Sequence, residues 1–433
     1  MTAMRLSPLS SLPDGGSGDS FGKIAVRQSS NNDQQTLSGA RSAVRIIYIT
    51  TIPLTLITFF DGFMSFMKKQ GFEVCCVSSD GDEIEALQQK FSIDAYKVDM
   101  TRMISPFRDA LSFFKLVNVF WRVKPDIVHA STPKASFLGM LAAKILAVPA
   151  RVYGCYGLRL ETERGLKRFI LWAAEWVSFR CAHVAVPNSA SLRKRIESLR
   201  LCGAQKMVTL GKGSSHGVEA ETIFNPSLFD PNVRARIRKQ YLIGEEAVII
   251  GYFGRLVRDK GIIELAHAWR MLREESPELI LMLIGDAEPQ EPLPDEVLRN
   301  FAADDSVVML GWVNPDQVAE YMSAMDVIVL PTYREGFPNV LLEAAAMELP
   351  VVATRVTGCV DAVIDGVTGT LVEPRDAEGL AKALLAYACD PQLRKQHGKA
   401  AREMVLRDFL PENILEDALR LYRQLLEKRR PRR

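Results

Sequence analysis

The sequence predicts an α/β protein with two doubly wound, parallel-sheet domains that face a central cleft. Short apolar runs alternate with helical segments in both halves of the chain. A stretch rich in Gly, Ser and Pro, residues 208–230, separates the halves. The 433 residues are enough for two domains of ordinary size. Because strands that alternate with helices form parallel sheets, a ligand is expected at the carboxyl ends of the strands.

The apolar runs locate the expected elements. In the first half, strands are expected at residues 44–50, 73–79, 94–98, 126–130, 150–154 and 183–187, with helical segments such as 107–123, 134–147 and 166–180 between them. In the second half, strands are expected at 247–251, 279–284, 307–310, 326–330 and 351–354, and the stretch 376–428 reads as nearly all helix.

The same pattern sets the expected boundaries. They are 1–42 for a leader, 43–210 for the first domain, 211–231 for a connector, 232–410 for the second domain, and 411–433 for a C-terminal helix and basic tail. The leader is rich in polar residues without an apolar core, so we expect disorder; a misassigned start is the alternative. The last helix is expected to pack back on the first domain. The basic residues 428–433 indicate either a solvated tail or attraction to anionic lipid.

Composition excludes several classes of protein. Hydrophobic residues make up 48% and charged residues 24%, which is typical of a soluble globular protein. A net charge of +2 argues against a nucleic-acid binder. The seven cysteines are scattered without metal-ligand spacing and the five histidines do not cluster, which predicts reduced thiols in a cytoplasmic protein and no metal site.

One apolar stretch, residues 46–67, is long enough to span a membrane and carries only Asp61 as a charge. Its start has the pattern of a first buried strand, and Pro53 then interrupts it. We therefore favour a strand followed by a helix over a transmembrane segment.

Two carboxylates flank a predicted helix start at residues 331–343. Glu335 precedes Gly336, Phe337 and Pro338, and Pro338 is expected at the first helical position. Glu343 then lies roughly a turn and a half into the helix. Free backbone N–H groups and the positive end of the helix dipole make an anion site between them. Carboxylates beside an anion site suit a nucleotide-sugar, although either carboxylate alone could be a solvated helix residue.

A second motif follows the strand at 247–251. Gly254 allows backbone to approach a ligand closely, Arg255 offers a planar fork for phosphate oxygens, and Lys260 adds a compact positive charge. Together they could neutralise a diphosphate without a metal ion. The alternative is a basic surface loop in which Arg258 and Asp259 pair.

The string Glu335-Gly-Phe-Pro-Asn and its spacing to Glu343 resemble the E-x7-E motif of retaining glycosyltransferases of family 4. The order Gly-Arg-Leu, four residues, Gly after residue 253 resembles that family's diphosphate loop. The resemblance covers about residues 44–428, is closest to the bacterial surface-polysaccharide branch, and implies the GT-B fold of two Rossmann-like domains, the first for the acceptor and the second for the donor.

The resemblance also implies residue roles. Glu343 would hold the ribose hydroxyls, Glu335 the sugar, and Arg255 and Lys260 the two phosphates. The implied donor-binding set is Gly254, Gly336, Phe337, Pro338, Asn339, Glu343 and Gly358, with Arg255, Lys260 and Glu335 catalytic. The strand at 307–310 would meet a uracil base. Many relatives have Glu where this chain has Asp361.

The sequence gives weaker evidence for the residues that would bind the acceptor. His129, at the end of the fourth strand, and Lys134, at the start of the next helix, are expected to face the cleft, with Tyr156 and Arg159 nearby. The family often has a His near position 156, and this chain has Tyr156 instead. That departure favours a front-face mechanism assisted by the donor phosphate. His129 could equally be structural.

The resemblance implies transfer of a hexose or N-acetylhexosamine from a UDP-sugar, without a metal or other cofactor, to a polyprenyl-diphosphate-linked saccharide. Capsule or lipopolysaccharide synthesis at the inner face of the bacterial cytoplasmic membrane is expected. The amphipathic stretch 158–176 could meet an anionic membrane surface or bury a core face. Rival functions are a GT-B nucleotide-sugar epimerase and an inactive nucleotide-sugar-binding subunit. A dehydrogenase is weakest, since no Gly-x-Gly-x-x-Gly opens a helix after a first strand.

Overall fold

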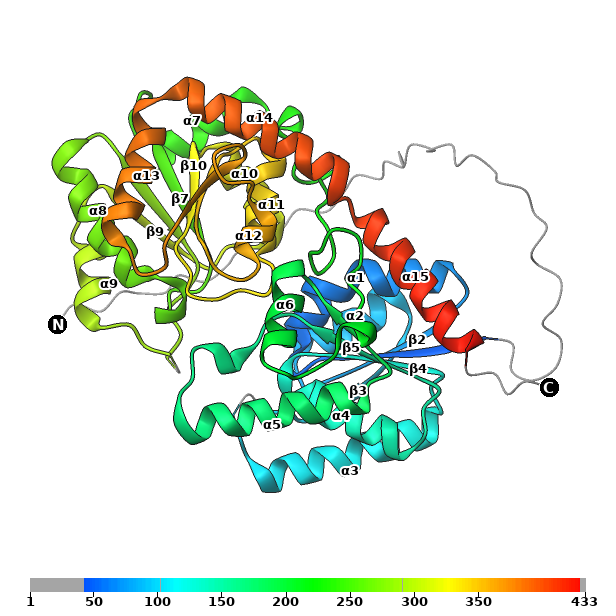
Figure 1. Cartoon of the computed structure of the whole chain (residues 1–433). Helices are drawn as coiled ribbons and strands as arrows, with labels where there is room; N and C mark the ends of the chain where they lie inside the picture. The colour runs from blue at the N-terminus through cyan, green and yellow to red at the C-terminus, as the bar shows by residue number, and fades with distance from the viewer. Residues whose placement is uncertain (1–42, 102, 290, 429–433) are drawn as a thin grey trace, which may run out of the picture. The chain divides into compact units, whose positions relative to one another are not determined.

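The computed structural model describes residues 43–101, 103–289 and 291–428. The predicted leader, residues 1–42, and residues 429–433 of the predicted basic tail lie outside this part of the chain. Within it, two parallel sheets hold the strands (Figure 1).

The first sheet has the strand order β3-β2-β1-β4-β5-β6. Its strands are β1 (Arg45–Ile49), β2 (Glu73–Ser78), β3 (Asp94–Lys97), β4 (Ile127–Ser131), β5 (Ala150–Cys155) and β6 (Val184–Pro187). The central β1 is paired on both sides, with Ile46 opposite Val74 of β2 and Ile127 of β4. Strands in this position are covered on both faces, which explains why they read as continuous apolar runs.

Helices cover both faces of this sheet. They are α1 (Pro53–Lys69), α2 (Asp82–Phe91), α3 (Pro106–Val123), α4 (Pro133–Ile145), α5 (Gly165–Cys181) and α6 (Ala190–Ser198). Apolar side chains of α3 to α6 form one core cluster, and those of α1, α2 and the C-terminal helix form the other. Three of these helices begin at a proline, which is favoured at the first helical position because its N–H would have no partner there.

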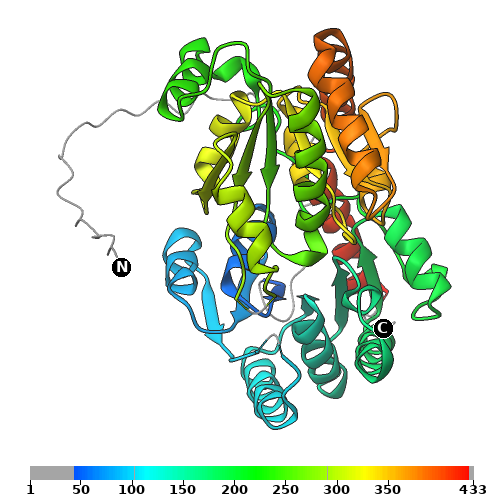
Figure 2. The same cartoon turned by 90° about the vertical axis from the view of Figure 1, so that its left-hand side faces the viewer.

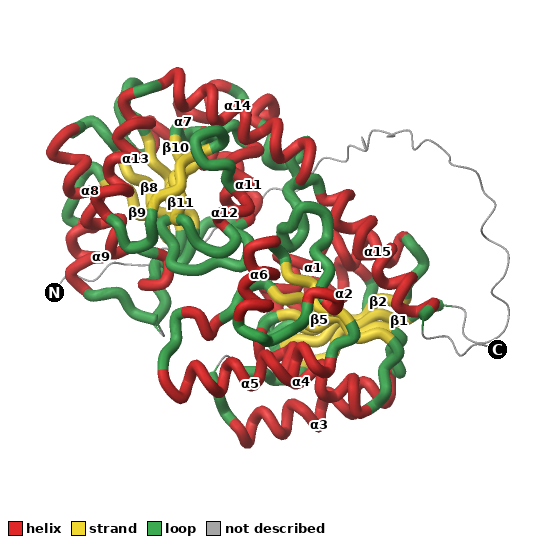
Figure 3. Tube along the Cα trace, viewed as in Figure 1, coloured by secondary structure: helices red, strands yellow, loops and turns green. Residues whose placement is uncertain are grey.

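The second sheet repeats the arrangement with the order β12-β11-β10-β7-β8-β9. Its strands are β7 (Ile249–Phe253), β8 (Ile280–Ile284), β9 (Val307–Gly311), β10 (Val327–Leu330), β11 (Val351–Thr354) and β12 (Gly369–Val372). Its helices are α7 (Pro231–Gln240), α8 (Ile262–Glu275), α9 (Asp295–Ala302), α10 (Val318–Ser323), α11 (Asn339–Ala346), α12 (Cys359–Ala362), α13 (Ala377–Cys389) and α14 (Pro391–Asp408). Figures 2 and 3 show the strands of each sheet between helices.

The predicted strands agree with the structure to within one or two residues, and β12 was missed. This strand has four residues, opens with Gly369 and lies at the edge of the sheet, so it lacks the long apolar run that marks the others. Residues 46–67 form β1 and most of α1, as favoured. No helix in the described part of the chain combines the length and hydropathy that a membrane span needs.

The C-terminal helix α15 (Pro411–Glu427) packs against α1 and the first sheet. Its Tyr422 is fully buried, and the Tyr422 hydroxyl lies 2.6 Å from Nδ1 of His129 on β4. Apolar side chains of the helix, Ile414 and Leu419 among them, join the core cluster formed by β1 and α1. The end of the chain therefore helps to build the first domain.

We predict that Tyr422→Ala lowers the free energy of unfolding by about 3–5 kcal/mol, because it opens a cavity and leaves the His129 ring without its partner. Urea unfolding followed by circular dichroism measures the loss. The neighbouring Arg423 is exposed on the same helix, so Arg423→Ala serves as the matched control, with an expected change of about 0.5 kcal/mol or less. Equal unfolding midpoints for the two variants would contradict a packing role for α15.

Candidate functional site

The candidate site lies where the strand order of each sheet reverses, between β1 and β4 and between β7 and β10. Chains that leave neighbouring strands in opposite directions open a crevice at this point, where α/β proteins bind ligands. On the first sheet, the Thr51 backbone N–H donates to Thr132 Oγ1 at 3.0 Å, which ties the loops after β1 and β4 together. On the second sheet, the loops after β7 and β10 carry both sequence motifs.

The helix start after β10 differs slightly from its prediction. Pro338 caps α11 with extended backbone, and Asn339 is the first helical residue. The prediction of Pro338 at the first helical position is therefore wrong by one residue. Phe337 is a predicted donor-binding residue; its side chain is buried, and its ring packs 5.6 Å from that of Phe409. Only the backbone of Phe337 is left to meet a ligand.

The two groups predicted to hold phosphate and sugar are paired with each other. The Lys260 ammonium donates to the Glu335 carboxylate, and both side chains are mostly buried. Gly261, directly after Lys260, has φ +71°, and an added Cβ would overlap the carbonyl oxygen of Pro331. This glycine therefore allows the loop after β7 to lie against the loop after β10.

The second predicted phosphate-binding group is also paired. Arg255 Nη1 lies 2.7 Å from a carboxylate oxygen of Glu288, a residue that the sequence analysis did not single out. Tyr252 donates its hydroxyl to the Arg255 carbonyl at 2.8 Å and holds this turn in place. The Gly254 N–H donates to Ile284 at 2.9 Å, so it stays within the sheet. Arg258 and Asp259 are not paired as the alternative required, because Asp259 binds Arg334 at 3.0 Å.

Glu343 differs from these paired groups. Its side chain is half-buried on α11, and no described residue gives its carboxylate a hydrogen bond or ion pair. Burial without compensation raises the pKa of Glu343 from 4.5 to about 7. A buried carboxylate with no internal partner is positioned to accept hydrogen bonds from a ligand.

Gly336 and Gly358 lie where the loops of the two sheets meet. An added Cβ on Gly336 would overlap the Tyr156 carbonyl oxygen, and one on Gly358 would lie 2.5 Å from the Gly336 carbonyl oxygen. Gly358 has φ +82°, and its N–H donates to Ser191 Oγ at 2.8 Å. Small residues are needed here because backbone packs directly on backbone.

Asp361 reinforces this junction. Its carboxylate accepts from the backbone N–H of Ser191 at 3.2 Å and also from the Ser191 hydroxyl. Ser191 lies in the first turn of α6, where backbone N–H groups have no partner within the helix. An aspartate of the second sheet thus caps a helix of the first, a role that its position in the sequence did not indicate.

His216, in the predicted connector, is a further residue that sequence reasoning missed. It lies 2.9 Å from Asn339 Nδ2, and its ring is 5.6 Å from that of Phe59 on α1. The Asn339 side chain also accepts from Ser214 at 2.8 Å. The side chain of Asn339, a predicted donor-binding residue, therefore links α11 to the connector. Burial lowers the pKa of His216 to about 4, so the ring is neutral. A lone histidine in a Gly/Ser-rich loop did not indicate that His216 would contact Asn339 and Phe59.

The expectation that His129 and Lys134 face a cleft is wrong. His129 is 1% exposed, packs on the rings of Tyr48 and Phe60, and bonds Tyr422. Lys134 Nζ lies 2.6 Å from the Asp109 carboxylate. Both side chains are held by helices of the first domain: His129 on β4 contacts α15, and Lys134 in the first turn of α4 pairs with α3.

The other two predicted acceptor residues lie nearer the second sheet. The Tyr156 ring packs against Phe59, and its backbone carbonyl touches Gly336. Arg159 Nη2 lies 3.7 Å from Glu291, in the loop after β8. The structure therefore places Tyr156 beside the loop after β10, which carries one motif, and Arg159 beside the loop after β8. Within the described part of the chain, His129 and Lys134 contact neither loop.

Comparisons with known proteins identify this arrangement. Residues 53–184 match the family described as glycosyl transferase 4-like, and residues 233–404 match glycosyl transferases group 1. The chain is 33% identical over 384 residues to the capsular polysaccharide biosynthesis glycosyltransferase CapM of Staphylococcus aureus, covering 89% of this chain and 98% of that protein. The chain belongs to the group 1, 4-like glycosyltransferases.

More distant relatives agree. The UDP-Gal:alpha-D-GlcNAc-diphosphoundecaprenol alpha-1,3-galactosyltransferase of Escherichia coli is 25% identical over 316 residues, covering 72% of this chain and 78% of that protein. Anabaena HepE, solved in complex with UDP, superimposes with a TM-score of 0.71 at 19% identity over 88% of this chain and all of that one. This glycosyltransferase therefore has the predicted GT-B fold and is related to enzymes of capsular polysaccharide and undecaprenyl-linked sugar transfer.

We predict that Gly336→Ala lowers the rate of sugar transfer by at least about tenfold, because a shift of the order of 1 Å between reacting groups can cost about 100-fold. The added methyl group would push the Tyr156 backbone away. Gly244 has open space around its Cα, so Gly244→Ala is the matched control. Wild-type activity in Gly336→Ala at unchanged thermal stability would mean that this contact does not set the catalytic geometry.

Proposed function

We propose that this glycosyltransferase moves a hexose or N-acetylhexosamine from a UDP-sugar to a polyprenyl-diphosphate-linked saccharide, with retention of anomeric configuration and without a metal ion. The reaction would serve surface polysaccharide synthesis, such as capsule or lipopolysaccharide, at the inner face of the bacterial cytoplasmic membrane. The observation that carries the donor assignment is the partnerless, half-buried carboxylate of Glu343 beside the start of α11.

Glu343 suits the ribose of a nucleotide. An ionised carboxylate can accept a hydrogen bond from each of two neighbouring hydroxyl groups, which would compensate for its burial. Just before the first residue of α11, the backbone at Gly336 and Phe337 leads into the helix, whose positive end favours phosphate.

Lys260 and Arg255 suit the diphosphate. Each is paired with a carboxylate, Lys260 with Glu335 and Arg255 with Glu288. A bound diphosphate would take over both cations, which stabilises the negative charge that develops on the leaving group. Glu335, released from Lys260, would then accept hydrogen bonds from sugar hydroxyls. The loop after β7 would thus serve the leaving group, and the loop after β10 the sugar.

The first domain supports a front-face reaction. Tyr156 stands where many relatives have histidine, and His129 is locked to Tyr422. The acceptor hydroxyl would therefore give its proton to the departing phosphate on the face from which the phosphate leaves. Relatives whose names specify capsular polysaccharide synthesis or a diphosphoundecaprenol-linked acceptor support the lipid-linked acceptor.

Glu343 gives the proposal a pH signature. Its carboxyl has a pKa of about 7 because of burial, and ribose hydroxyls would donate to the ionised form. We predict that UDP affinity rises with pH up to about 7 and levels above it, with up to about tenfold lost per pH unit below. Calorimetry in EDTA from pH 5.5 to 8 measures this, with GDP and NAD as controls.

The phosphates of UDP titrate in the same range, with a pKa of about 6. The variant Glu343→Gln therefore serves as the reference that separates titration of the ligand from titration of Glu343. We expect this variant to bind UDP about 10- to 100-fold more weakly above pH 7, since hydrogen bonds to charged groups contribute about 1.5–3 kcal/mol. Any pH dependence of UDP affinity that remains in this variant comes from the phosphates of UDP. Indifference of UDP binding to this substitution would exclude the ribose role.

We predict that Lys260→Ala slows transfer about 100- to 1000-fold, the typical cost of losing one preorganised donor to developing charge. Lys382, exposed on α13, gives Lys382→Ala as the control. A rate within tenfold of wild type would overturn the assignment. Running the assay with and without a lipid-linked acceptor separates the rivals, since an epimerase forms product from the donor alone and a binding subunit forms none.

A further inference from the structure

Helix α3 exposes large apolar side chains along one face. Phe107 is 90% exposed, and about two-thirds of the surface is exposed in Leu111, Phe114 and Trp121. At 100° per residue these four positions fall within about 80° of one another around the helix axis. Met103, in the loop before α3, is exposed as well. An apolar stripe of this length on a surface helix marks a contact with something that the described chain does not provide.

Helix α5 carries a second stripe of the same kind. Leu166, Phe169, Ile170 and Trp176 are exposed on one side of it. Helix α4 packs against both α3 and α5, so the three helices lie side by side on one face of the first sheet (Figures 1 and 2). The two stripes therefore belong to one layer of the first domain.

The exposed charges of these two helices are positive. They are Arg108, Lys115 and Arg122 on α3 and Lys167 and Arg180 on α5. Among the described residues of both helices, no acidic side chain is exposed: Asp109 pairs with Lys134, and Glu175 is buried against the Tyr153 hydroxyl. Apolar stripes bordered by basic side chains are complementary to an anionic bilayer, which takes aromatic groups at its interface.

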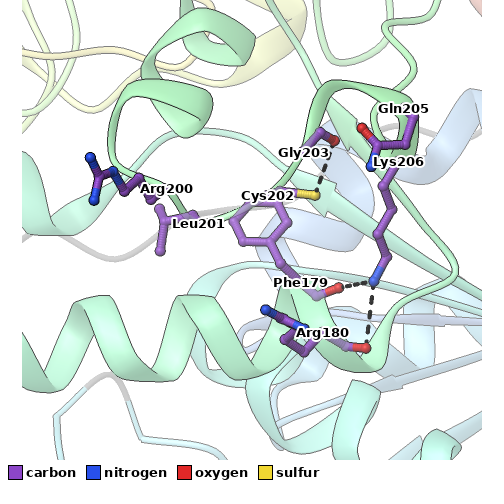
Figure 4. A pocket seen from close by; sticks show the side chains of 8 residues that line it. All are labelled: Phe179, Arg180, Arg200, Leu201, Cys202, Gly203, Gln205 and Lys206. Atoms are coloured by element: carbon purple, nitrogen blue, oxygen red, sulfur yellow. Dashed lines mark hydrogen bonds between the residues drawn. The ribbon is translucent and has the colours of Figure 1, made fainter.

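The α5 stripe ends at a basic depression of about 460 Å³ (Figure 4). Its lining includes Arg180, Arg200 and Lys206 and contains no carboxylate. Arg180 lies 4.8 Å from the ring of Trp176, which connects the depression to the stripe. Lys206 reaches the carbonyls of Phe179 and Arg180 at the end of α5, as Figure 4 shows. Partial burial lowers the pKa of Lys206, so a phosphate there would gain a poorly solvated partner.

We propose that the α3–α5 face docks on a bilayer of anionic phospholipid, with the two aromatic stripes in the interface and a headgroup phosphate in the depression at Arg180 and Arg200. This inference rests on the proposed lipid-linked acceptor, which it would present to the enzyme at the level of the headgroups. It names the surface and the lipid chemistry, which the proposed function leaves open.

Vesicle sedimentation of the full chain tests the proposal. We expect binding to vesicles with about one-third phosphatidylglycerol and little binding to pure phosphatidylcholine, because each basic residue near an anionic surface adds attraction. Phe107→Ser/Trp121→Ser should weaken binding at least about tenfold, since burial of each aromatic ring is lost. Arg180→Glu/Arg200→Glu should weaken it similarly and remove the preference for anionic lipid.

Matched controls come from the second domain. Leu242 is 94% exposed, so Leu242→Ser controls for loss of an exposed apolar group. Lys395 and Lys399, exposed on α14, give Lys395→Glu/Lys399→Glu as the charge reversal. All variants should keep wild-type UDP binding and thermal stability, which separates a failure of docking from a failure of the proposed donor site.

Three results would overturn the proposal: equal vesicle binding by the face variants and their controls, equal binding to neutral and anionic vesicles, or no binding by the wild type. A change from dimer to monomer on gel filtration in Phe107→Ser/Trp121→Ser would assign the face to a second copy of the chain instead. If UDP fails to bind while the lipid results hold, the donor assignment falls and the docking face stands.

Discussion

The geometry of the site depends on a backbone contact between Gly336 at the start of α11 and the carbonyl of Tyr156 after β5. No side chain fits between them, so the two loops approach as closely as polypeptide can. On one side of the contact, Asp361 binds the first turn of α6. On the other, Asn339 binds His216 in the connector. Both polar contacts satisfy buried or helix-end groups that would otherwise cost free energy. Polar contacts on the neighbouring segments therefore hold the backbone contact at Gly336 in place.

Ion pairs neutralise most of the charge at the site. Unpaired charges in a partly buried site are costly, and removal of water strengthens each interaction between them. Lys260 and Arg255 avoid this cost through Glu335 and Glu288. Glu343 has no such partner and responds through a raised pKa. A diphosphate that bound both cations would free Glu335 and Glu288 from their ion pairs, so the same cations are held in place before and after the donor binds.

The sequence was sufficient for the fold because its information is local. Apolar runs such as those of β1 and β7 are read from neighbouring residues, and prolines mark the starts of α1, α3 and α4. The motif residues were found for the same reason. Partners distant in the chain could not be found this way. Ser191 meets Asp361 across 170 positions, and His129 meets Tyr422 across 293. The last helix was expected to pack on the first domain, but the pairing of its Tyr422 with His129 is specified by no local pattern.

The two domains divide the chemistry unequally. The residues that carry charge at the candidate site, Lys260, Arg255 and Glu335, all belong to the second sheet, whereas the first contributes the backbone and ring of Tyr156. His216 lies near this junction, yet its pKa of about 4 keeps the imidazole neutral at physiological pH, so it can exchange hydrogen bonds without adding charge. On the proposed roles, the groups that bind the donor lie in the second domain, so changes to the surface of the first domain would leave them in place.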